Sequence, residues 1–296
     1  DAALARAAGI VPFLPADAPA HLAEYRAPAG FEARYPGFSS PNDVYIATHA
    51  IEGLSRLGRH PAGMGAETGA QTVGGIIATG LAALTGRPVR LTNEAVIGAE
   101  SSDLERQLAN ALDRVERPHV AVILIGANDV THRIDRATAV RHLELVVQRL
   151  RGMGVEVVVG TCPDLGTVEP IPIPLKHLLR RWSRDLAAAQ TVAVVEAGGR
   201  TVSLGDLLGP EFSAAPKELF SEDQFHPSPA GYARVAAVLL PTVCAALGVG
   251  TAGDTQDRRP EPDRGETVEP VAVAAGHAVL DPGTEVSGTD LAGVDR

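Results

Sequence analysis

The sequence predicts an α/β protein with a three-layer α/β/α architecture and a parallel sheet. From about residue 43 to residue 248, segments with the apolar spacing of helices alternate with short apolar segments typical of strands. One expected strand, residues 119–125, is almost continuously apolar, as required where helices cover both faces of a parallel sheet. The chain has 296 residues, of which 45% are hydrophobic, so it can bury one substantial core.

The expected strands are apolar runs at residues 44–47, 89–96, 119–125, 155–161 and 201–204. The expected helices occupy residues 71–84, 102–115, 136–153, 175–195 and 229–247. The first has apolar residues at helical spacing and ends near Gly86. The second carries Asp103 in its first turn, the third is amphipathic, and the fourth holds the only tryptophan, Trp182. The last begins at Pro229 after Ser228, a residue that favours the N-cap position.

Composition divides the chain into three parts. Residues 1–42 are rich in Ala and Pro, so we expect an N-terminal extension with a short helix at most. Residues 43–248 make up the α/β domain. Residues 249–296 are rich in Gly, Thr, Asp, Glu and Pro without a sustained period, so we expect an acidic, disordered tail. Within this tail, residues 271–280 form a weak apolar cluster, which is either a linker or a docking segment.

The charge distribution argues against nucleic acid as a partner. The net charge is −10, and residues 251–296, with 10 acidic and 4 basic side chains, carry −6 of it. No basic stripe or cluster is evident in the body of the chain. Aromatic residues make up 4% of the chain, too few for a base-stacking platform.

The two cysteines and the lengths of the apolar runs limit the possible metal sites, disulfides and membrane spans. Cys162 and Cys244 lack metal-ligand spacing, and the sequence leaves open whether they pair or are two buried thiols. No run of 18 apolar residues occurs, so we expect no membrane span in this chain. The chain begins with Asp1 rather than Met, so we expect a processed or truncated form. Cell-envelope, secreted and cytoplasmic locations all stay open, as does the oligomeric state.

The clearest candidate site is the stretch at residues 223–232, before the last expected helix. It places a carboxylate, Asp223, three residues before His226, and Pro227 then fixes the backbone. Asp223 can orient the imidazole and stabilise its protonated form, which a general base in acyl transfer requires. A histidine in a loop is often only solvated, and this alternative stays open for the stretch taken alone.

Two further loops follow expected strands and carry candidate oxyanion donors. Gly98 permits close backbone approach and leaves its N–H free for a ligand oxygen, although a glycine there is often only part of a turn. Asn128 can donate to an oxyanion from its side chain, and Asp129 can hold the loop through backbone N–H groups. The alternative for this Asn-Asp pair is an Asx turn or a helix cap.

Taken together, these segments resemble blocks II, III and V of the SGNH (GDSL-type) hydrolases, in order and spacing. The matching residues are Gly98 with Ser101-Ser102-Asp103-Leu104, then Gly126-Ala127-Asn128-Asp129, then Asp223-Gln224-Phe225-His226-Pro227. The stretch Val159-Gly160-Thr161-Cys162-Pro163-Asp164-Leu165 also looks like the actinobacterial branch of that family. The resemblance covers residues 43–247, roughly two-thirds of the chain.

This resemblance implies a flavodoxin-like sheet and esterase, lipase or acyltransferase chemistry on a small-molecule ester or acyl substrate, through a serine acyl-enzyme. It implies that His226 is the base and Asp223 its orienting partner. It assigns the oxyanion donors to the Gly98 N–H, the Asn128 side chain and the N–H of the nucleophile itself. It implies no metal and no organic cofactor.

The nucleophile segment departs from the family pattern. Where the family has Gly-Asp-Ser after the first strand, this chain has Gly58-Arg59-His60, followed by the family-like turn at residues 62–65. Three explanations stay open. Ser55 has taken over after a local insertion, or the site is inactive and the protein only binds ligands, or residues 48–61 reflect a compensated frameshift over an ordinary Gly-Asp-Ser.

A Rossmann-type oxidoreductase finds little support. The run Gly63-Met64-Gly65 resembles part of a dinucleotide fingerprint, but the next glycine, Gly69, stands one residue too far along. The sequence therefore favours an ester hydrolase or acyltransferase, with an inactive ligand-binding protein on the same fold as the alternative.

Overall fold

The computed structural model describes residues 66, 69–96, 98–115, 117–168 and 171–249, together with strands at residues 22–25, 42–48 and 284–285. The strands form a seven-stranded sheet in the order β1-β3-β2-β4-β5-β6-β7. They are β1 (Leu22–Tyr25), β2 (Asn42–Thr48), β3 (Val89–Asn93), β4 (Val120–Leu124), β5 (Glu156–Gly160), β6 (Arg200–Val202) and β7 (Thr284–Glu285). Strand β1 pairs antiparallel with β3, and the other neighbours pair in parallel.

The strand order confirms the flavodoxin-like fold. Counted along the chain, the parallel strands β2 to β6 lie in the order 2-1-3-4-5, which is the flavodoxin-like arrangement. From β2 the chain first crosses to β3 on one side and then returns to β4 on the other, so the order reverses between β2 and β4. Thr48 at the end of β2 lies beside Leu124 at the end of β4. Ligands of such sheets bind beyond the carboxyl ends of the strands at this switch point.

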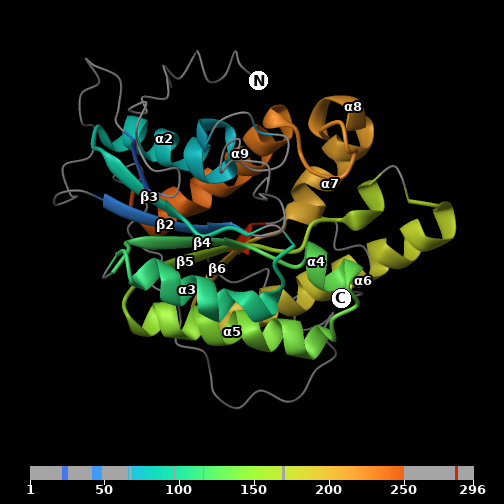
Figure 1. Ribbon diagram of the computed structural model, residues 1–296, viewed down its shortest axis with the longest axis horizontal. Helices are drawn as coiled ribbons and strands as arrows, with labels where there is room; N and C mark the ends of the chain where they lie inside the picture. Colours follow the sequence, from blue (N-terminus) through green and yellow to red (C-terminus); the bar gives the residue numbers. More distant parts are fainter. Residues whose placement is uncertain are drawn as a thin grey trace, which may run out of the picture.

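Helices cover both faces of the sheet (Figure 1). On one face lie α2 (Val73–Thr85) and α9 (Pro229–Ala246), and on the other lie α3 (Leu104–Leu112) and α5 (Arg136–Gly152). Beyond the carboxyl ends of the strands come α4 (Ala127–Thr131), the start of α6 (Ile173–Glu196), α7 (Leu204–Ala214) and α8 (Pro216–Leu219). Short 3₁₀ turns η1 (Gly69–Gln71), η2 (Ser101–Asp103) and η3 (Leu165–Thr167) precede α2, α3 and α6.

Alternating side chains of β4 supply the two cores. Val120, Val122 and Leu124 pack into the cluster shared with α2 and α9. Ala121 and Ile123 point the other way, into the cluster shared with α3 and α5. All five side chains are fully buried. This is the pattern that the continuous apolar run predicts, because both faces of the strand are covered.

The last helix is apolar because it lies in the core. By length and mean hydropathy, α9 is the one helix in the described part of the chain that meets the criteria for a membrane span. It contacts α2, α7, α8 and the strands β5 and β6. Ser228 caps it as expected, since its side chain accepts the Gly231 N–H at 3.1 Å.

Several elements depart from the expectations. Strand β7 lies within residues 249–296, where we expect a disordered tail, and it pairs in parallel with β6. Strand β1 lies within residues 1–42, where the sequence predicts a short helix at most, and it forms by pairing with the edge of β3. Helices α7 and α8 occupy what the sequence predicts to be a loop before His226. Gly205, Gly209 and Pro210 make α7 look like a loop, but Leu204 and Leu208, one helical turn apart, are buried in the core and hold the helix in place.

Both cysteines are free and buried. Cys162 follows β5, and Cys244 lies on α9. Burial raises the pKa of the Cys162 thiol well above its usual range, and it raises the pKa of Cys244 to about 11. The structure therefore favours the second of the two alternatives, a pair of buried thiols.

We expect Gly75→Ala to lower the free energy of unfolding by more than about 1 kcal/mol, because an added Cβ in α2 would collide with the backbone of Gly69 and Ala70. Gly152→Ala is the matched control, since an added Cβ at the end of α5 meets nothing within 4 Å. For Gly152→Ala we expect the free energy of unfolding to rise by about 0.5–1 kcal/mol. Chemical denaturation of both variants measures the difference, and equal effects would contradict this account of α2 packing.

Candidate active site

The structure brings Asp223 and His226 into direct contact. Nδ1 of His226 lies 2.6 Å from Oδ2 of Asp223. The other carboxylate oxygen, Oδ1, accepts hydrogen bonds from the backbone N–H groups of Phe225 and His226, each at 2.9 Å, and from the Ser221 hydroxyl at 2.7 Å. One carboxylate thus fixes both the loop backbone and the imidazole. An ionised carboxylate only accepts hydrogen bonds, so Nδ1 carries the proton and Nε2 is left as the basic nitrogen.

A narrow turn holds this pair in place. Phe220 and Pro227 form an antiparallel bridge, and the Ser221 N–H donates to the His226 carbonyl at 2.7 Å. At the tip, Gln224 has a φ of 55°, a left-handed conformation that glycine and asparagine adopt more readily. The turn then leads directly into α9, whose first residue is Pro229. The position of the imidazole is therefore coupled to a helix that is packed in the core.

The hydrogen bonds to Asp223 keep it ionised. Burial alone would raise the pKa of this carboxyl group. The hydrogen bonds from the His226 side chain, from two backbone N–H groups and from Ser221 outweigh burial and hold the pKa well below its usual range. A negative charge is therefore present beside the imidazole at neutral pH.

A second pair of loops meets at the ends of β3 and β4. Nδ2 of Asn128 donates to the Ala99 carbonyl at 2.9 Å. Asp129, which is 1% exposed, accepts both the backbone N–H and the hydroxyl of Ser101 at 3.0 Å. The expectation that Asp129 holds a loop through backbone N–H groups is confirmed. These bonds fix the Gly98 loop against α4.

Gly98 has a positive φ, a backbone conformation that glycine adopts readily. Its φ is 74°, and an added Cβ would meet no atom within 4 Å, so the residue faces open space. Within the described residues, no acceptor lies in hydrogen-bond range of its N–H. Asn128 uses one of its two amide hydrogens on Ala99 and keeps the other. Both groups can therefore donate to a ligand.

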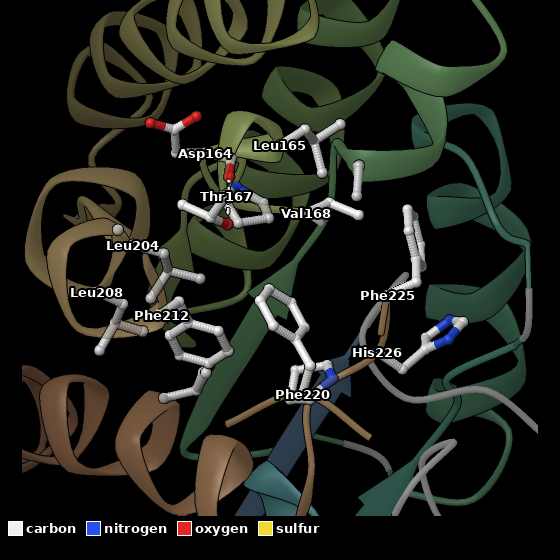
Figure 2. A pocket seen from close by; sticks show the side chains of 15 residues that line it. Asp164, Leu165, Thr167, Val168, Leu204, Leu208, Phe212, Phe220, Phe225 and His226 are labelled. Atoms are coloured by element: carbon white, nitrogen blue, oxygen red, sulfur yellow. Dashed lines mark hydrogen bonds between the residues drawn. The ribbon is translucent and has the colours of Figure 1, made fainter. Parts of the chain in front are cut away.

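An apolar pocket leads away from His226. Figure 2 shows Phe225 and His226 on one side of the view and Leu204 and Leu208 of α7 on the other. Ala127, the residue before Asn128, also lines this pocket. The Asn128 loop and the His226 loop therefore border the same cavity. Three phenylalanines, half of the six in the chain, contribute to its wall: Phe212, Phe220 and Phe225.

The pocket wall at η3 is braced by an ion cluster. The Asp164 carboxylate is 4% exposed and contacts Nε of Arg180 at 3.2 Å and a terminal nitrogen of Arg184 at 3.3 Å. It also accepts the Gly166 N–H at 2.8 Å. The labelled carboxylate lies at the upper left of Figure 2, away from the phenylalanines. Asp164 thus ties η3 to α6, while Leu165 and Thr167 of η3 line the pocket.

The structure thus joins Asp223 with His226, and Gly98 with Asn128. Ser55 and the whole segment at residues 49–65 lie outside the described residues, so the predicted nucleophile cannot be placed beside them. The pocket-lining phenylalanines were not identified as site residues from the sequence. Their clustering at positions 212–225, in a chain with few aromatic residues, is the signal that points to them. No group of metal-ligating side chains occurs in the part of the chain that the structure describes.

Comparisons with known proteins show the family and the fold of this chain. Residues 61–234 match the family model of the GDSL-like lipase/acylhydrolase family. The match begins after Ser55 and after Gly58-Arg59-His60. The GDSL-like esterase Rv1075c of Mycobacterium tuberculosis is 43% identical over 178 residues, which are 60% of this chain and 57% of that protein. The chain therefore matches little more than half the length of this relative.

Solved structures show the same fold. TesA has a TM-score of 0.53 and 19% sequence identity, over 70% of this chain and all of that one. A variant of Axe2, an acetyl-xylooligosaccharide esterase from Geobacillus, has a TM-score of 0.52 and 17% identity, over 70% of this chain and 94% of that one. At these identities the likeness concerns the fold.

We expect the Asp223→Asn variant to lose stability relative to wild type at neutral pH, with the difference shrinking in acid. The pKa of Asp223 is lowered in the folded state, so its ionised form stabilises the fold above about pH 4, and this contribution is lost as the pH falls through the folded-state pKa. Unfolding measured at several pH values tests this, with Glu222→Gln as the control on an exposed neighbour. A difference that stays constant down to acid unfolding would contradict it.

Proposed function

Because this chain belongs to the GDSL-like lipase/acylhydrolase family, we propose that it hydrolyses carboxylic esters through an acyl-enzyme, with His226 as the general base. The observation that carries the proposal is the Asp223-bound imidazole of His226 at one end of an apolar pocket. The hydrolase domain is assigned to residues 43–248, with an N-terminal extension and an acidic tail outside it. Strands β1 and β7, from these two flanking segments, extend the sheet at its edges.

In this mechanism Nε2 of His226 takes the proton of a nucleophilic hydroxyl as that oxygen attacks the ester carbonyl. The same proton then passes to the leaving alkoxide, so the alcohol departs neutral and the acyl group stays on the enzyme. Water, activated by His226, releases the acid. Asp223 keeps the Nδ1–H tautomer and stabilises the imidazolium that forms in each step.

The negative charge on the carbonyl oxygen needs donors that are already in place. We assign this role to the Gly98 N–H and to the second amide hydrogen of Asn128, together with the N–H of the nucleophile. The hydrogen bonds of Asn128 to Ala99 and of Ser101 to Asp129 support the assignment, since they fix both donors before substrate binds. Such preorganised donors lower the barrier because they need no reorientation during reaction.

Ser55 is the proposed nucleophile. It lies in the segment that follows β2, and the end of β2 lies beside the end of β4 at the switch point of the sheet. The pocket between His226 and α7 would take the acyl chain, because its walls are largely apolar. Water as acceptor makes the protein an esterase, and a sugar or alcohol would make it an acyltransferase.

The second candidate function is ligand binding without turnover. The observation that favours it is the replacement of Gly-Asp-Ser by Gly58-Arg59-His60, ahead of the point where the family match begins. The nucleotide sequence of codons 48–61 separates a compensated frameshift from a true departure, since a frameshift would restore Gly-Asp-Ser in another reading frame.

Labelling with a fluorophosphonate probe tests the nucleophile. We expect the full chain to be modified at Ser55, as located by mass spectrometry, and His226→Ala to lower the labelling rate by at least about a hundredfold because the base is lost. Equal melting temperatures of the two proteins exclude unfolding as the cause. Absence of labelling in the wild-type chain would favour the ligand-binding alternative.

Gly209→Leu tests the acyl pocket. Gly209 of α7 lines the pocket, and an added Cβ would sit at ordinary contact distance, 3.7 Å, from Cβ of Asp164. We expect the leucine to fill the far end of the pocket, lowering kcat/KM for long-chain nitrophenyl esters by roughly tenfold or more while acetyl esters react as before. Gly209→Ala is the control, and equal losses for both ester lengths would contradict this location of the acyl chain.

A further inference from the structure

The first turns of α6 expose apolar side chains to solvent. In the described part of the chain, five large hydrophobic residues are exposed, and three of them lie here: Ile173 at 72%, Leu175 at 41% and Leu178 at 39%. We call Ile173, Leu175 and Leu178 the α6 tip. The buried stripe of α6 begins only at Leu179. The tip thus continues the helix beyond the point where the core ends.

The helical turns that carry the tip are also rich in basic residues, within an acidic protein. Residues 171–184 contain four basic residues, Lys176, Arg180, Arg181 and Arg184, and no acidic one, whereas the whole chain has a net charge of −10. Part of this charge is offset by ion pairs. Asp164 pairs with Arg180 and Arg184, and Asp185 pairs with Arg181. Arg181 remains 80% exposed. Apolar and cationic side chains therefore share one end of the helix.

The tip projects on the side of the molecule that carries the pocket. At the right of Figure 1, the first turns of α6 extend past α4 and α7, beyond the carboxyl ends of the strands. Thr167 and Val168, only a few residues before α6, line the pocket that ends at His226. A surface that held the tip would thus lie close to this pocket.

We propose that the α6 tip docks on an anionic lipid surface. Exposed apolar side chains beside cations are the combination that binds such surfaces, since the former enter the boundary of the acyl region and the latter attract the headgroups. A second copy of this chain fits less well. A symmetric contact through the tip would bring the two sets of cations together. On the basis of the ester hydrolysis proposed above, docking would present lipid esters to the pocket.

Sedimentation of the full chain with vesicles tests the docking without any turnover. We expect binding to vesicles of phosphatidylcholine mixed with an equal amount of phosphatidylglycerol, and weak binding to phosphatidylcholine alone. The triple variant Ile173→Ser/Leu175→Ser/Leu178→Ser should lower the partition coefficient by roughly tenfold or more. Arg181→Gln should lower it by roughly fivefold, because one cation near the surface is lost.

The matched control is Leu84→Ser/Leu145→Ser, which removes the other two exposed leucines, at 36% and 42% exposure, from α2 and α5. It should bind as wild type does, and all variants should melt at similar temperatures. Equal binding of the triple variant, or no binding by the wild-type chain, would overturn the proposal. Self-association that is lost in the triple variant would also overturn it, in favour of a second copy at the tip. Hydrolysis of a soluble short-chain ester should be the same in all variants, so failure of the docking and failure of the proposed function are distinguishable.

Discussion

The fold depends on the complete burial of β4. Every side chain of this strand is fully enclosed, with alternate residues serving opposite cores. A shift of one residue would exchange the two sets and place each in a cavity shaped for the other, so the register is fixed. The end of the strand is fixed with it. Gly126 follows at a φ of 127°, where an added Cβ would lie 2.9 Å from Cβ of Cys162. The positions of Asn128 and Asp129 are therefore consequences of how β4 is packed.

The features that local sequence determines could be predicted from the sequence. The period of apolar residues located the sheet strands between residues 89 and 202 and the helices α2, α3, α5, α6 and α9, with shifts of a few residues at their ends. The spacing of Asp223 and His226 predicted their contact, because a carboxylate three residues before a histidine reaches it within a single turn. Ser228 before Pro229 predicted the start of α9 in the same way.

The remaining features depend on contacts between distant segments, which periodicity does not report. Strand β1 has four residues and forms by pairing with the edge of β3. Helix α7 contains two glycines and a proline, and its buried leucines stabilise it only when the core is present. The pocket combines residues from η3, α7 and the His226 turn. The sequence marks part of this wall only through the clustering of Phe212, Phe220 and Phe225 in a chain with few aromatic residues. It does not show that these residues meet η3 and the His226 turn.

The reactivity of the two buried thiols, Cys162 and Cys244, reports on unfolding of the protein. Alkylating reagents attack the thiolate, and burial both raises the pKa of each thiol and keeps reagents away from it. Cys162 lies two residues after the end of β5, and Cys244 lies on a helix that covers the sheet. Modification of Cys244 alone therefore marks detachment of the outer layer, whereas modification of Cys162 marks rupture of the sheet interior. Chemistry at two sulfur atoms thereby distinguishes partial from global unfolding, without any introduced label.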